Sequence, residues 1–144
     1  AKDNSYTYNL AFFYHKFGDF GKAMQLLQDV EFTDVYYNLD ARSLLLQVYY
    51  ELDEYDAFVS LVNSYSIFLV RNKAVSEVQF SVKMILVKLV KVLFRLKQKM
   101  PLMKNAAFQK EFAALQEKIA NTKPLANKKW LMEMVEQLNS SQSS

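Results

Sequence analysis

Cysteine is absent from this sequence of 144 residues, and glycine, proline and histidine are scarce, with two, two and one copies. Without cysteine the chain has no disulfide bond, no thiol nucleophile and no zinc–thiolate site. With so little glycine and proline there are few points at which the chain can turn sharply, whereas 51% of its residues are hydrophobic. This composition argues against a sheet-rich fold and predicts long helices.

The residues that carry catalysis are equally sparse. A hydrolytic triad needs a nucleophile, a base and an orienting group, yet His15 is the only histidine. His15 and Asp19 lie one helical turn apart, but two ligands do not complete a zinc site. The acidic group Asp53, Glu54 and Asp56 lacks the spacing of a calcium-binding EF-hand. Two glycines cannot form a glycine-rich phosphate loop. We therefore expect no enzymatic activity, no metal and no cofactor.

Acidic and basic residues are divided unevenly along the chain. Residues 1–77 hold eleven acidic and six basic residues, for a net charge of −5, and residues 78–144 hold four and twelve, for +8. No acidic residue lies between Glu77 and Glu111, where the basic residues are Lys83, Lys88, Lys91, Arg95, Lys97, Lys99, Lys104 and Lys110. The tract 83–104 makes a helical nucleic-acid-binding domain one alternative, in which five of these bases would neutralise phosphates, namely Lys83, Lys88, Lys91, Arg95 and Lys99. Protein binding is favoured over it, because lysine outnumbers arginine there and no recognised nucleic-acid motif is present.

An internal repeat with a period of 35 residues covers the first half of the chain. The matching pairs are Leu10 with Leu45, Tyr14 with Tyr49, Asp19 with Glu54, Phe20 with Tyr55, and Leu27 with Val62. Helical hairpins of this length stack on one another, because each hairpin alone cannot bury its apolar face. The repeat therefore predicts an all-α solenoid of helical hairpins, and a binding function rather than a catalytic pocket.

The helical spacing of apolar residues predicts seven helices, at about residues 5–17, 20–31, 34–51, 53–71, 76–99, 105–121 and 127–138. Asp19 and Asp53 are expected to start the second and fourth helices, and Ser76 with Gln79 forms a capping box for the fifth. Residues 5–71 make two hairpins and residues 76–138 a divergent C-terminal group, all within one domain over 1–138. The serine-rich tail 139–144 is expected to be disordered.

The fifth predicted helix is long and unusually apolar, but basic residues recur along it at nearly every turn. A charge near the centre of a bilayer costs about 3 kcal/mol, so we expect no membrane insertion. Beside its main apolar face the helix carries a second stripe, Val87, Val90 and Phe94, which is flanked by Lys88 and Lys91. Because the two halves of the chain have opposite charge, this stripe is an alternative surface for self-association into a homo-oligomer.

The first hairpin resembles a tetratricopeptide repeat, a 34-residue helix–turn–helix unit. The matching residues are Leu10 and Ala11 for the family's Leu-Gly pair, Tyr14 and Phe20 for its two aromatic positions, Gly18 for its interhelix glycine, and Ala23 and Leu27 for its small and large packing residues. The second hairpin keeps Leu45, Tyr49 and Tyr55 but departs from the family at Leu46, Asp53 and Phe58. We therefore expect its helices to sit farther apart or to cross differently. Residues 49–57 and 122–131 also resemble the C-terminal part of long, uncharacterised bacterial tetratricopeptide proteins.

The resemblance implies a right-handed superhelix in which the first helix of each hairpin lines a concave groove. Carried over position by position, it implies a partner-binding groove lined by Tyr8, Phe12, His15, Lys16, Ser43, Gln47, Tyr50 and Glu51, with Ser5 and Asp40 at further matching positions. The aromatic side chains would offer flat contact area for a peptide or helix, and the charged ones would orient a polar chain. For Tyr8 and Phe12 the alternative is ordinary core packing beneath a further repeat.

The sequence begins at Ala1 without a methionine and shows no charged segment followed by an apolar one, so no secretion signal is in view. We therefore expect a cytoplasmic scaffold or adaptor segment of a larger protein, with a protein or peptide as its partner.

Overall fold

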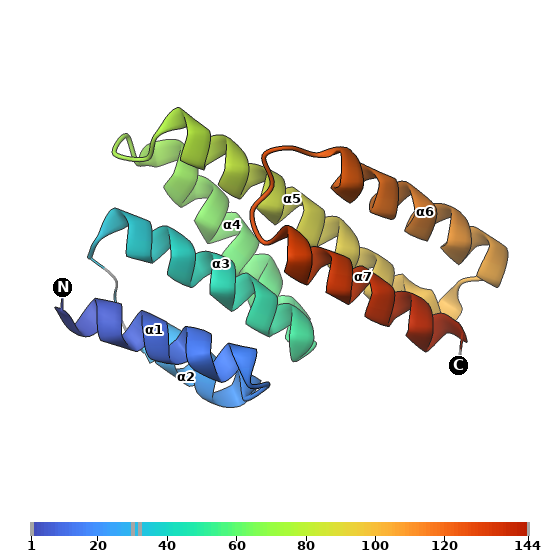
Figure 1. Cartoon of the computed structure of the whole chain (residues 1–144), viewed down its shortest axis with the longest axis horizontal. Helices are drawn as coiled ribbons and strands as arrows, with labels where there is room; N and C mark the ends of the chain where they lie inside the picture. Colours follow the sequence, from blue (N-terminus) through green and yellow to red (C-terminus); the bar gives the residue numbers. More distant parts are fainter. Residues whose placement is uncertain (1, 30, 32, 144) are drawn as a thin grey trace. The chain divides into compact units, whose positions relative to one another are not determined.

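The computed structural model describes residues 2–29, 31 and 33–143 (Figure 1). Across these residues the protein contains seven α-helices and no strand, which confirms the all-α prediction. The helices are α1 (Lys2–Lys16), α2 (Phe20–Asp29), α3 (Val35–Glu51), α4 (Tyr55–Arg71), α5 (Glu77–Lys99), α6 (Asn105–Asn121) and α7 (Lys128–Ser143), and a short 3-10 helix, η1 (Met100–Leu102), follows α5.

Two helix starts and one helix end follow local signals in the sequence. Asp19 Oδ1 accepts a hydrogen bond from the Lys22 amide at 3.3 Å, and Ser76 Oγ accepts one from the Gln79 amide at 3.2 Å. Each bond satisfies an amide that has no partner within its own helix. α5 ends two residues before Pro101, whose ring is incompatible with a helix interior. These three boundaries agree with the predictions.

The last helix is longer than the sequence predicts. α7 continues to Ser143, whereas a disordered tail is expected over 139–144, of which Ser144 lies outside the described residues. Asn139 accepts a hydrogen bond from the Gln109 side chain of α6 at 3.3 Å, and the Ser141 hydroxyl donates to the main-chain carbonyl one turn earlier at 3.0 Å. Residues of α7 beyond Leu138, the last apolar residue of the helix, are thus held by a hydrogen bond to α6 and by one from a side chain to the main chain of α7.

The turns that end α1 and α3 have the same hydrogen bonds, 35 residues apart. In each turn the second and third amides after the helix donate to carbonyls three and five residues earlier, with N–O distances of 3.1 and 2.8 Å after α1 and 3.2 and 2.9 Å after α3. The residue at the centre of each turn is left-handed, with φ of 80° at Gly18 and 58° at Asp53. Asp53 therefore occupies the position of Gly18, and the prediction that it starts α4 is wrong, since α4 begins at Tyr55.

The two glycines are expected to respond oppositely to alanine. Gly18→Ala should lower the free energy of unfolding by about 1 kcal/mol, because an L-residue is strained at positive φ even though a Cβ there meets no atom within 4 Å. Gly21 lies in α2, also with open space around a Cβ, so Gly21→Ala should raise that free energy by about 0.5–1 kcal/mol. Urea denaturation of both variants measures the difference. Equal effects at the two positions would contradict the left-handed turn.

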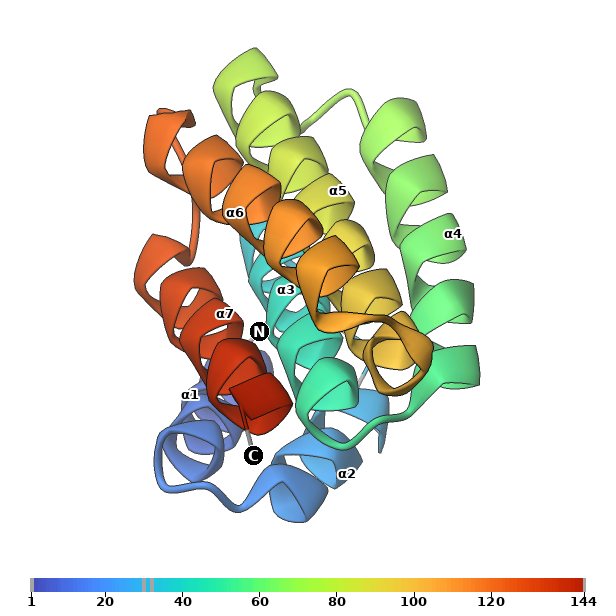
Figure 2. The same ribbon diagram turned by 90° about the vertical axis from the view of Figure 1, so that its right-hand side faces the viewer.

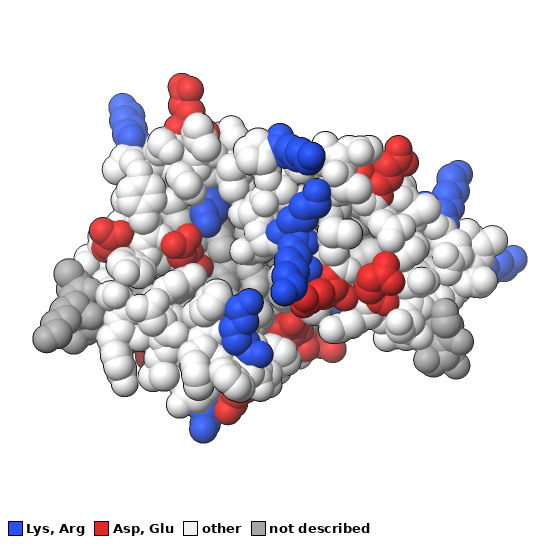
Figure 3. All heavy atoms as spheres, in the orientation of Figure 1, with Lys and Arg blue, Asp and Glu red and all other residues white. Residues whose placement is uncertain are grey.

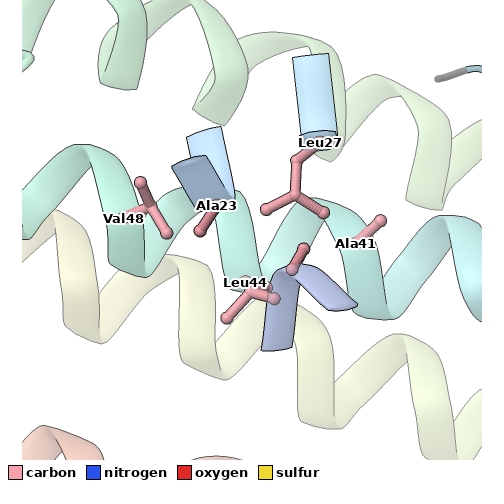
Figure 4. Packing of buried hydrophobic residues seen from close by; sticks show 6 residues of the cluster. Ala23, Leu27, Ala41, Leu44 and Val48 are labelled. Carbon is pink, nitrogen blue, oxygen red and sulfur yellow. The ribbon is translucent and has the colours of Figure 1, made fainter. Parts of the chain in front are cut away.

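The first hairpin packs on α3 through small side chains. Ala11 of α1 and Ala23 of α2 have no exposed surface, and alanine at these positions lets the two helices approach closely. The cluster that they form is completed by Leu27, Ala41, Leu44 and Val48 (Figure 4). Three consecutive helices thereby share one core.

The hairpin of α3 and α4 is built from larger side chains. Leu46 and Phe58, which stand where the family prefers small residues, are 0% and 1% exposed. Tyr65 of α4 has no exposed surface, and its hydroxyl donates to the Leu39 carbonyl at 3.0 Å and lies 2.8 Å from the Ser43 hydroxyl. Buried hydrogen bonds thus join α4 to α3, in addition to the packing of these larger side chains.

The packing divides the chain into two compact units, residues 1–87 and 88–144, with the boundary inside α5. The sequence predicts a single domain over 1–138 and does not mark this boundary. In the second unit α6 and α7 lie side by side (Figure 2), and Gln116 donates to Glu136 across them at 3.2 Å. The buried side chains of this unit are Leu89, Val90, Leu93, Phe94, Leu96, Phe108, Phe112, Leu115, Ile119, Trp130, Leu131, Met134, Val135 and Leu138.

Candidate partner-binding surface

Three rings on α1 and α3 form a continuous group, which we call the aromatic row. Tyr8 and Phe12 lie one turn apart on α1, and Tyr37 lies in the first turn of α3. The ring centroid of Tyr8 is 6.3 Å from that of Phe12 and 5.8 Å from that of Tyr37, within the range of favourable aromatic pairs. Phe12 is 42% exposed and the other two rings are half-buried. The row is therefore anchored by its tyrosines and open at its phenylalanine.

Polar groups lie at both ends of the aromatic row. At one end the Lys16 ammonium nitrogen is 5.2 Å from the Phe12 ring centroid, a cation–π geometry that leaves the charge in solvent. At the other end Ser5 Oγ lies 3.0 Å from the Tyr37 hydroxyl. The side chain of Asp40, one turn after Tyr37, is 46% exposed. The row thus joins a positive end to a polar and negative end.

The Tyr8 hydroxyl stays neutral at physiological pH. Burial raises the pKa of Tyr8 to about 12, and the charge of Asp40 and the neighbouring Tyr37 act in the same direction. Asp40 Oδ1 in turn accepts a hydrogen bond from Lys83 Nζ at 3.0 Å, and Lys83 is only 8% exposed. A neutral phenol can both donate and accept a hydrogen bond, so Tyr8 can serve either main-chain group of a bound peptide.

His15 and Glu51 contact one another. His15 Nε2 lies 2.9 Å from Glu51 Oε2, and their side chains are 10% and 11% exposed. The Phe20 ring packs against the imidazole with a centroid distance of 5.6 Å. The pair connects the C-terminal ends of α1 and α3, so the two residues are placed to hold these helices together. The sequence predicts them as groove residues but does not show that they face each other.

The remaining groove residues predicted on α3 lie in the interior. Ser43, Gln47 and Tyr50 are 3%, 6% and 3% exposed, and burial raises the pKa of Tyr50. Ser43 is used inside the hairpin by its contact with Tyr65. Because α3 is buried over most of its circumference, its polar residues do not mark an open face. Of the eight predicted groove residues, Tyr8, Phe12 and Lys16 are those that present substantial surface.

The alternative surface on α5 is divided between interior and exterior. Val87, Val90 and Phe94 are 2%, 0% and 0% exposed, whereas Lys88 and Lys91 are exposed. The expected apolar centre for self-association is therefore core. A helix that is apolar on two faces is covered on both, and the lysines remain on the side that faces solvent.

A cleft that the sequence does not reveal lies over α3, between α2 and α4. It consists of two adjoining cavities of about 570 and 530 Å³ that share Arg42 and Phe68. Arg42 Nε donates to Asn38 Oδ1 at 2.6 Å, and its guanidinium carbon lies 4.6 Å from the Phe68 ring centroid. Burial lowers the pKa of Arg42. In the sequence, the one indication of this cleft is that Arg42 stands among apolar residues of α3. Periodicity alone does not separate the lining of a cleft from a core.

Comparison of the chain with family models, curated proteins and solved structures found no match. The resemblance to tetratricopeptide repeats is thus carried by the matching residues of the first hairpin. Of the helices in the described part of the chain, none combines the length and the apolar character needed to cross a membrane. Among the same residues no group of three or more histidine, aspartate or glutamate side chains could hold a metal ion.

Proposed function

We propose that this chain is a non-enzymatic protein-interaction module, a tetratricopeptide-like stack of helical hairpins that binds an extended peptide or a partner helix. The partner lies along the aromatic row on α1 and α3. A polypeptide with an apolar residue over Phe12 and an acidic group toward Lys16 fits the arrangement of charges.

The observation that carries this proposal is the aromatic row itself. Tyr8 and Tyr37 fix the rings by packing, while Phe12 offers 42% of its surface. Preordered aromatic side chains lose little conformational entropy on binding, which is why they dominate the binding energy of many protein interfaces. The sole imidazole, His15, contacts Glu51, which supports a structural role for this histidine.

A nucleic-acid partner is favoured less. Two of the five bases expected to contact phosphates are in ion pairs, since Lys83 contacts Asp40 at 3.0 Å and Lys99 contacts Glu111 at 2.9 Å. The other three are Lys88, Lys91 and Arg95, which are exposed. Three phosphate contacts would give a weak, salt-sensitive and sequence-blind interaction.

The proposal predicts that a partner crosslinks from the aromatic row. A photoreactive phenylalanine analogue at position 12 should capture the partner protein, whereas the same group at Ile67, which is 51% exposed in the Arg42 cleft, should not. Phe12→Ala should then weaken the captured partner about 5- to 30-fold, which corresponds to roughly 1–2 kcal/mol, because truncation removes the open ring of the row. Isothermal titration calorimetry with the purified partner measures the loss.

Tyr36→Ala is the matched control, because Tyr36 is an exposed aromatic residue, at 48%, that is not a member of the row. It should leave the affinity unchanged. Capture from position 67 alone, with normal affinity for Phe12→Ala, would move the binding site to the Arg42 cleft. Capture of a nucleic acid instead of a protein would favour the basic tract.

A further inference from the structure

α1 carries a second exposed aromatic surface on a different face from the aromatic row. Tyr6 and Phe13 of α1 and Phe17, the first residue after it, are 70%, 52% and 74% exposed, and spacings of seven and four residues place them on one side. We call this set the outer stripe. The rings of Phe13 and Phe17 are in contact, with centroids 4.5 Å apart. In the view of Figure 3 the surface over α1 carries few charged side chains. Exposed aromatic side chains gathered on one side of a helix make this face a candidate interaction site.

The internal repeat shows what such a stripe contacts. The residues 35 positions after those of the outer stripe are Ala41 and Val48 on α3 and Leu52, the first residue after α3. Ala41 and Val48 are 5% and 0% exposed, because the preceding hairpin α1–α2 packs on them, and Leu52 packs against the same cluster. The turns after α1 and α3 have the same hydrogen bonds, so the equivalence holds for the backbone as well as for the sequence. The stripe that is covered on α3 is open on α1.

We propose that the outer stripe is the docking face for a helical hairpin of the same repeat type, seated on α1 as α1–α2 is seated on α3. The occupant must present small side chains, as α1–α2 does with Ala11 and Ala23. Its contact face must also leave more room than that of α1–α2. The residues equivalent to Ala41 and Val48 are the larger Tyr6 and Phe13. This docking is independent of the proposed function, which uses the aromatic row.

A tandem chain tests the docking. It carries a second copy of residues 1–35 directly before residue 1, which keeps the 35-residue spacing. Two versions are made. One keeps Leu27 in the added copy, and the other has Leu27→Ala there, to make room for the larger rings of the outer stripe. If the added hairpin covers the stripe, at least one version should unfold in a single transition with a melting temperature about 5–10 °C above that of the parent chain. Amide hydrogen exchange in α1 should slow, and binding of the dye ANS should fall.

Two controls separate docking from a general effect of length. Ala23→Glu in the added copy places a charge in its small face and should abolish the rise in melting temperature. Phe13→Glu in the original copy should abolish it too, while the same change in the parent chain should have little effect because the side chain is 52% exposed.

Two results would overturn the docking proposal. An added copy that stays unfolded or melts separately, with no change in the rest of the chain, would show that the stripe does not accept such a hairpin. A parent chain that sediments as a dimer and becomes a monomer on Phe13→Glu would assign the stripe to a second copy instead. Neither result affects crosslinking from position 12, so the proposed function is tested separately.

Discussion

Trp130→Ala is expected to lower the free energy of unfolding by about 3–5 kcal/mol, which is a large share of the stability of a small domain. Trp130 lies on α7 and is 9% exposed, and it is the largest side chain of the second unit. The substitution removes a buried indole and leaves a cavity that rigid helices cannot fill completely. Urea denaturation followed by far-UV circular dichroism measures the change, since the variant has no tryptophan fluorescence.

Met132→Ala provides the control within the same helix. Met132 is 44% exposed, so its truncation should change the free energy of unfolding by less than about 0.5 kcal/mol. A Trp130→Ala variant as stable as Met132→Ala would mean that α7 does not contribute its buried face to the fold. Hydrogen exchange would then show fast exchange throughout α7 in the parent chain.

Several helix boundaries could be predicted from the sequence because their signals are local and do not depend on neighbouring helices. Asp19, Ser76 and Pro101 act within a few residues of where they stand, and the boundaries they predict agree with the structure. The prediction that Asp53 starts α4 is wrong because an acidic residue before an apolar stretch is typical of a helix start but is not restricted to it. The 35-residue repeat instead pairs Asp53 with Gly18, which lies in the turn after a helix and has a left-handed backbone, as Asp53 does.

The candidate surface was harder to predict, because exposure depends on neighbours that are distant in sequence. Phe12 and Tyr50 are both aromatic residues that the sequence predicts to line the groove, yet Phe12 is 42% exposed and Tyr50 is 3% exposed. The same limit applies to Phe94, which lies between the exposed Lys91 and Arg95 in sequence and has no exposed surface. Periodicity identifies the faces of a helix, but only the tertiary packing decides which face remains open.

Tyr65→Phe is expected to lower the free energy of unfolding by about 1–3 kcal/mol at neutral pH, because the phenol makes the buried hydrogen bonds that join α4 to α3. Without it the Leu39 carbonyl loses a donor at 3.0 Å, and the Ser43 hydroxyl loses its partner at 2.8 Å. The ring and its packing are retained, so the loss reports the hydroxyl alone. Tyr36→Phe, at a position 48% exposed, should be neutral.

The pH dependence gives the same hydroxyl a second and more specific test. Burial raises the pKa of Tyr65 above its ordinary value of 10.0, with the charge of Asp40 acting in the same direction and the Ser43 hydrogen bond and Arg42 opposing it. Because the pKa of Tyr65 is higher in the folded state than in the unfolded state, the stability that the neutral phenol contributes is complete below pH 10. This stability is lost as the pH rises through the pKa of the folded state. The parent chain should therefore lose stability above pH 10 more steeply than Tyr65→Phe, so that the difference between them narrows. The Tyr65→Phe variant should still lose some stability at alkaline pH, because burial also raises the pKa values of Tyr8 and Tyr50. Parallel pH profiles for the two proteins would show that the Tyr65 hydroxyl is not buried in the hydrogen-bonded state described above.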